Sequence, residues 1–122
     1  MIKFLKTLPL LAVIILLPCR MIIIDVPVYD YFESYRELKE FVARDDTEQC
    51  TYVRNKFDCE DFAMRFQRNA LKEGKITNCQ WVYRNGEKHC LISVFIPKEN
   101  MCYHVEPQWD LIFKVETLDE NP

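Results

Sequence analysis

The sequence predicts an α+β fold in which N-terminal helices pack on an antiparallel sheet. Apolar residues recur at helical spacing in residues 33–43, and again from about residue 58 to residue 72. After Gly74 the chain changes to strand-like segments, and Asn85-Gly86 between two of them is a strong signal for a two-residue hairpin.

The composition is that of one folded domain. The chain has 122 residues, of which 49% are hydrophobic and 29% charged, so a packed core is expected and disorder is not. The net charge of -3 gives no reason to expect nucleic acid, which favours basic surfaces. With only two glycines the chain has no phosphate-cradling loop, and we expect no organic cofactor.

The N-terminus has the pattern of a secretory signal. Lys3 and Lys6 precede an apolar run over residues 8–17, and Met21-Ile22-Ile23-Ile24 is apolar again after Arg20. We expect residues 1–24 to be a signal peptide or an uncleaved anchor, with membrane attachment through residues 8–24, and the protein to be exported or membrane-anchored. The alternative is a buried N-terminal strand or helix of a cytosolic protein. Residues 25–122 then form the folded domain.

Each element has its own local signal. A helix is predicted over residues 33–43 and ends at Asp45-Asp46; residues 47–56 form a loop in which Tyr52 is the expected anchor. The second helix begins at Asp58 or Cys59 and ends at Lys72, before Gly74. The predicted strands cover residues 78–83, 88–96, 101–106 and 111–115.

The start of the second helix carries the most distinctive chemistry in the chain. Cys59 lies there among the carboxylates of Asp58, Glu60 and Asp61. Only a thiolate attacks, and the unpaired N–H groups of a helix start favour it, whereas adjacent carboxylates oppose it. We therefore expect some of these acids to cap the helix, Asp61 also having Arg65 as a possible partner, or a Ca²⁺ ion bound by Asp58 and Glu60 to offset them.

The cysteine count leaves two readings of Cys59 open. If the segment through Cys19 is removed, five cysteines remain, and an odd number leaves at least one thiol without an intramolecular partner. Cys59 is either that reactive thiol or a structural cysteine. The other four could form up to two disulfides in pairings that the sequence does not determine; these are Cys50, Cys79, Cys90 and Cys102.

Two histidines and one glutamate are candidate partners for the thiol. His89 begins the strand after the hairpin, and Glu106 ends the next one, so adjacent strands can bring them together. His104 is the competing base, but its position two residues before Glu106 is awkward for a direct hydrogen bond. A zinc site made of Cys79, Cys90, Cys102 and His104 is a further alternative, although the spacing lacks the paired ligands of zinc ribbons.

The motif Asp58-Cys59-Glu60-Asp61-Phe62-Ala63 resembles the nucleophile motif of bacterial transglutaminase-like cysteine proteinases. His89 and Val105-Glu106-Pro107-Gln108, ending in Asp110, are similar to the papain-like protease domain of certain fungal agglutinins. The resemblance covers roughly residues 28–118. The sequence departs from the usual pattern at Lys88, Cys90 and Trp109.

This resemblance implies a papain-like or transglutaminase-like core, and a cysteine peptidase domain over residues 25–122. It implies Cys59 as nucleophile, His89 as general base and Glu106 as the acid that orients the imidazole, acting on a protein or peptide substrate. It also implies support by calcium, bound through Asp58 and Glu60. The alternative function is a non-catalytic binding module on the same fold, calcium-bound or disulfide-bridged.

Overall fold

The computed structural model describes residues 28–115. The predicted signal peptide or anchor, residues 1–24, lies outside the described residues. Among the helices of residues 28–115, none is long and apolar enough to cross a membrane.

Helix α2 extends from Tyr35 to Arg44. It begins two residues later than predicted because Ser34 is its N-cap, and the Ser34 hydroxyl accepts a hydrogen bond from the Glu37 N–H at 3.1 Å. The helix ends at Asp45, whose N–H donates to the Phe41 carbonyl. Its apolar face, made of Leu38, Phe41 and Val42, is buried.

The segment between the two helices is predicted as a loop, and it contains the short 3-10 helix η1 at Thr47–Gln49. Thr47 is fully buried and anchors this segment. The expectation that Tyr52 is the anchor is wrong, because Tyr52 is 47% exposed. The following Val53–Phe57 bridge turns the chain and leads it into the second helix.

Helix α3 extends from Cys59 to Lys72. Its buried stripe consists of Phe62, Ala63, Phe66 and Ala70, the set that the helical spacing predicts. Gly74 follows at φ 73°, a left-handed conformation that glycine adopts without strain, and it ends the helix as predicted.

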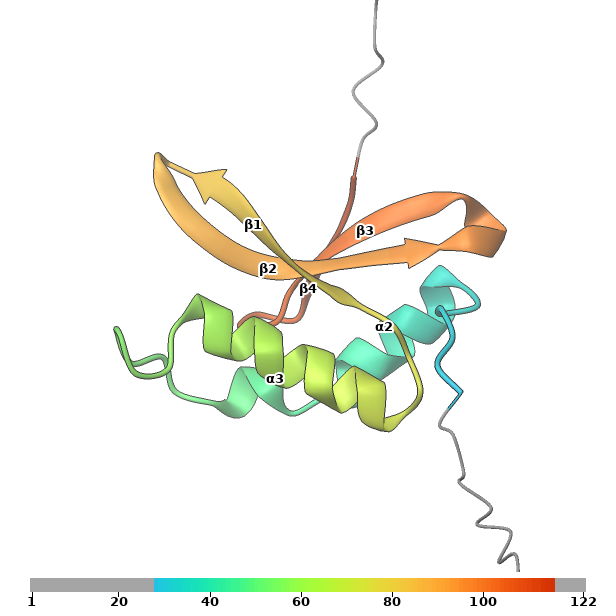
Figure 1. Cartoon of the computed structure of the whole chain (residues 1–122), viewed down its shortest axis with the longest axis horizontal. Coiled ribbons are helices and arrows are strands. Elements are labelled where there is room, and N and C mark those ends of the chain that lie inside the picture. The colour runs from blue at the N-terminus through green and yellow to red at the C-terminus, as the bar shows by residue number, and fades with distance from the viewer. Residues whose placement is uncertain (1–27, 116–122) are drawn as a thin grey trace, which may run out of the picture.

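The second half of the chain is an antiparallel meander (Figure 1). Its strands are adjacent in the order β1-β2-β3-β4, with β1 at Asn78–Arg84, β2 at Glu87–Ile96, β3 at Met101–Glu106 and β4 at Leu111–Lys114. Asn85 and Gly86 have φ angles of 52° and 78°, the positive pair that a two-residue hairpin between β1 and β2 requires. The predicted α+β class, with helices on an antiparallel sheet, is confirmed.

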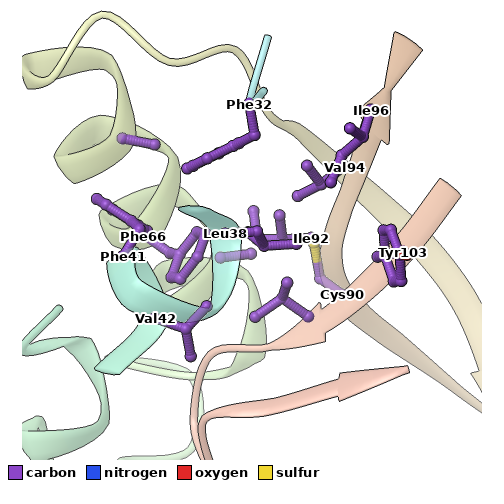
Figure 2. Close-up of a cluster of buried hydrophobic side chains, with 13 residues drawn as sticks. Phe32, Leu38, Phe41, Val42, Phe66, Cys90, Ile92, Val94, Ile96 and Tyr103 are labelled. Atoms are coloured by element: carbon purple, nitrogen blue, oxygen red, sulfur yellow. The ribbon is translucent and has the colours of Figure 1, made fainter. Parts of the chain in front are cut away.

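Both helices lie on the same side of the sheet (Figure 1). The core fills the space between the helices and the sheet (Figure 2). Its sheet side consists of alternate residues of β2, namely Cys90, Ile92, Val94 and Ile96, each at most 1% exposed, together with Tyr103 and Val105 of β3. His89 immediately precedes Cys90, so its side chain lies on the opposite face of β2 from these four β2 residues. This alternation separates the structural residues of β2 from the candidate base.

Candidate active site

Cys59 is the first residue of α3, where the backbone N–H groups of the helix start have no partners within the helix. The position follows from local sequence. Asp58 is the N-cap, and Asp58 and Asp61 form a capping box that begins the helix at this residue. The Asp58 N–H donates to the Asp61 carboxylate at 3.0 Å, so two of the three flanking acids cap the helix. Of the two roles possible for Asp61, the structure shows capping rather than pairing with Arg65, which bonds Asp46.

The Cys59 sulfur lies against strand β2. It accepts a hydrogen bond from the Cys90 N–H, with 3.4 Å between nitrogen and sulfur. That N–H is free for this contact because the register of β2 with β3 ends at the Ile92–Val105 pair, and Pro107 follows β3. Since the Cys90 nitrogen is bonded to the His89 carbonyl carbon, the sulfur is within about 6 Å of the His89 Cα.

His89 and Glu106 are in direct contact. The His89 Nε2 bonds the Glu106 Oε2 across two adjacent strands, β2 and β3, as predicted from the sequence. The Glu106 side chain is 2% exposed and the His89 side chain 17% exposed. Because Nε2 is held by the carboxylate, Nδ1 is the ring nitrogen that can receive a proton from a thiol.

Cys59 and His89 line one cavity of about 230 Å³. Among residues 28–115 no hydrogen bond joins the sulfur to the imidazole directly. Catalytic hydrogen bonds are often long in a free enzyme and shorten when substrate binds. The Cys59 thiol and the His89 imidazole therefore line the same cavity, and the Glu106 carboxylate contacts the imidazole.

The sequence motifs identify only part of this cavity. Its lining also includes Tyr52, Arg84, Asn85, Glu87, Lys88 and Gln108. Arg84 is the most informative of these, because its Nη2 is 3.4 Å from the Glu106 Oε2. The Asn85-Gly86 signal fixes the hairpin register and could have placed Arg84 beside His89, since the register pairs Val82 with His89.

His104 has a different environment. Its Nε2 is 3.2 Å from the Gln80 Oε1, and it does not line the cavity that holds Cys59. Burial lowers the pKa of His104. The structure therefore brings His89, and not His104, into contact with Glu106.

Asp58 and Glu60, the residues expected to bind calcium, lie at the start of α3. The Asp58 carboxylate accepts from the Glu60 N–H at 3.3 Å and serves the capping box, so it is turned toward the helix backbone. Glu60 is exposed. Within residues 28–115, no group of three or more His, Cys, Asp or Glu side chains is placed to hold a metal ion, and this also covers the zinc alternative. Calcium support of the site stays a prediction.

All five cysteines of the described region are free thiols, so the disulfides that the sequence left possible are not formed in this structure. Cys90 is buried, and burial, followed by the nearby Cys79 and Cys59, raises the pKa of its thiol to about 12. Its sulfur lies in the core (Figure 2). Cys79 is exposed and lies 3.5 Å from the Gln67 Oε1. Cys59 differs from Cys79 and Cys90 because it lies at the start of a helix and lines the cavity.

The comparisons with known proteins add no family to this geometry. No family model, no curated protein and no solved structure matches the chain.

Proposed function

We propose that this protein is a thiol-dependent acyl-transfer enzyme, a cysteine peptidase or transglutaminase-like enzyme on a papain-like or transglutaminase-like core. The observation that carries the proposal is the His89–Glu106 contact at the edge of a cavity that Cys59 also lines. A nucleophile, a base and a group that orients the base are the three parts such a site needs.

The proposed steps use only this chain's residues. The His89 Nδ1 takes the proton of Cys59, and the sulfur attacks the carbonyl carbon of a protein or peptide substrate. The tetrahedral intermediate collapses to a thioester as the amine leaves with the proton from His89. Water or a second amine then attacks the thioester, again through His89, and frees the thiol.

Two features of the helix start support these steps. The N-terminus of α3 places the partial positive charge of the helix at the position of Cys59. The Cys59 N–H has no acceptor among residues 28–115, so it can donate to the oxygen of a tetrahedral intermediate. Glu106 holds the imidazole in the orientation and tautomer that the first step needs.

The proposal includes export. Residues 1–24, with Lys3, Lys6 and the apolar run over residues 8–17, serve in it as signal peptide or anchor. The substrate is then a protein or peptide outside the cytoplasm.

Site-resolved alkylation tests the proposal. The reduced protein is treated with iodoacetamide at neutral pH, and the rate at each cysteine is measured by peptide mass spectrometry. A free thiol is only a few per cent thiolate at pH 7, so we expect Cys59 to react about tenfold or more faster than the exposed Cys79. His89→Ala should remove that advantage.

The matched control is His104→Ala, which removes the other imidazole and should leave the Cys59 rate unchanged. A p-nitrophenyl ester of an acetylated amino acid supplies the second readout, because a Cys59 thioester should form and release p-nitrophenol in the wild type and not in Cys59→Ser. Equal alkylation rates of Cys59 and Cys79 would contradict the proposed site, and so would a Cys59 rate that is lost in His104→Ala but retained in His89→Ala.

A further inference from the structure

The Glu106 carboxylate has a second partner besides the imidazole. Arg84, the last residue of β1, places its Nη2 3.4 Å from the Glu106 Oε2, the same oxygen that His89 contacts. Glu106 is 2% exposed, whereas the Arg84 side chain is 49% exposed and reaches the carboxylate from the cavity side. A guanidinium is always charged, so Arg84 places a permanent positive charge next to the buried Glu106 carboxylate.

The negative charge of a buried carboxylate must be compensated by a positive charge or by strong hydrogen-bond donors. If His89 supplied that positive charge, it could no longer act as a base. An ionised carboxylate removed from water is unfavourable unless a positive charge or strong donors accompany it. His89 supplies a full positive charge only as the doubly protonated imidazolium, which cannot accept a thiol proton. Arg84 removes this conflict, since it compensates Glu106 while the imidazole is neutral.

The other titratable groups of the cavity do not replace Arg84. Lys88 is directed toward Trp81, with its Nζ 5.9 Å from the ring centroid, and Glu87 has the same charge as Glu106. Tyr52 and Cys59 supply no positive charge. Among residues 28–115, the side chains within ion-pair distance of Glu106 are Arg84 and His89.

We propose that Arg84 is a positioning residue of the Cys59 site. It keeps Glu106 ionised, so that neutral His89 donates its Nε2–H to the carboxylate and leaves Nδ1 without a proton. When Arg84 is replaced by a neutral side chain, the Glu106–His89 pair takes up one proton from solvent. Whether that proton resides on the carboxylate or on the ring, the hydrogen-bonded pair then carries a hydrogen on Nδ1. The proposal rests on the proposed function only in treating Nδ1 as the catalytic base.

Nitrogen NMR of His89 tests this directly. The full-length chain carries Cys59→Ala, which removes a thiol that could transfer its proton to the ring, and His104→Gln, which leaves His89 as the single histidine. The ¹⁵N shifts of Nδ1 and Nε2 are read at about pH 7.5, above the usual titration range of imidazole. We expect an unprotonated Nδ1 with Arg84 present. In Arg84→Gln we expect the ratio of protonated to unprotonated Nδ1 to rise about tenfold or more, the equivalent of one pH unit.

Further variants make the result specific. Arg84→Lys retains the charge and should restore the unprotonated Nδ1, and Lys88→Gln removes a charge from the same cavity and should leave it unchanged. In a Glu106→Gln background, Arg84→Gln should have no effect. Arg84→Leu tests the same loss of charge should the glutamine variant not fold. If the ratio of protonated to unprotonated His89 Nδ1 is the same with arginine, lysine, glutamine or leucine at position 84, Arg84 is not a positioning residue. An Arg84-dependent Nδ1 in a protein without acyl-transfer activity supports the positioning role and contradicts only the proposed function.

Discussion

Among single residues, Asp110, which directly precedes β4, shows how burial changes the pKa of a carboxyl group. Asp110 Oδ1 and Glu48 Oε2 are both buried, and neither has a hydrogen-bond partner among the described residues. Burial, with the charges of Glu48 and Asp45 adding to it, raises the pKa of Asp110 from 3.8 to about 6. The folded protein therefore binds a proton at this position over a pH range in which the unfolded chain does not.

We predict that Asp110→Asn stabilises the protein at neutral pH. Because the folded-state pKa is raised, the wild type loses stability as the pH rises from about 4 to 6, and it does not regain it above that range. The variant lacks this loss and should be roughly 2 kcal/mol more stable at pH 7. Asp110 has a φ of 52°, a conformation that asparagine tolerates well, so the backbone should be unaffected.

Urea denaturation at about pH 7 and at about pH 3 is the measurement, since both forms of residue 110 are neutral at the lower pH and the difference should vanish there. Glu87→Gln removes an exposed acid from the same chain and serves as the control. If Asp110→Asn is less stable than the wild type at pH 7, the charged Asp110 carboxylate stabilises the folded state, and the prediction is wrong.

At the scale of one element, the capping box of α3 links stability to the site. Asp58 accepts from the backbone of the first helical turn, and the Asp61 carboxylate accepts from the Asp58 N–H. These contacts satisfy donors that the helix leaves unpaired, and they determine that Cys59 is the first helical residue.

We predict that Asp58→Ala destabilises the protein by about 1 kcal/mol, the usual cost of losing an N-cap. Glu60→Gln, which changes an exposed acid of the same turn, should cost much less.

Thermal unfolding with calcium and then with chelator is the measurement. If the acids act as caps alone, the loss in Asp58→Ala is equal in both conditions. If calcium stabilises the wild type and neither variant, Asp58 and Glu60 bind the ion as the sequence analysis expected.

At the scale of the whole molecule, two phenylalanines join the helices under the sheet. Phe41 of α2 and Phe66 of α3 are at most 1% exposed, and their rings meet edge to face with centroids 5.2 Å apart (Figure 2). The position of α3 beneath β2, and with it the position of Cys59 against Cys90, depends on this packing.

We predict that Phe66→Ala lowers the free energy of unfolding by about 3–5 kcal/mol, because a fully buried aromatic side chain is lost and a cavity remains. Leu71→Ala, on the exposed face of the same helix, should cost less than about 1 kcal/mol. Urea denaturation gives both values. Similar losses for the two variants would mean that the aromatic contact does not hold α3 in place.

Local chemistry determined much of this protein in advance. Helical spacing identified the buried stripe of α3, the Asn85-Gly86 pair identified the β1–β2 hairpin, and the acids around Cys59 identified a helix start. Each of these features depends on residues within one or two turns of chain, where capping, periodic burial and positive φ act directly.

Tertiary structure alone decided the rest. The sequence favoured His89 over His104 as the partner of Glu106, but the contact itself depends on the register of β2 with β3 and on the side-chain orientations. The same packing turned Asp58 toward the helix backbone and brought Arg84 to Glu106. These contacts join residues that are far apart in the chain, and their geometry depends on how three strands and a helix pack, which no local pattern specifies.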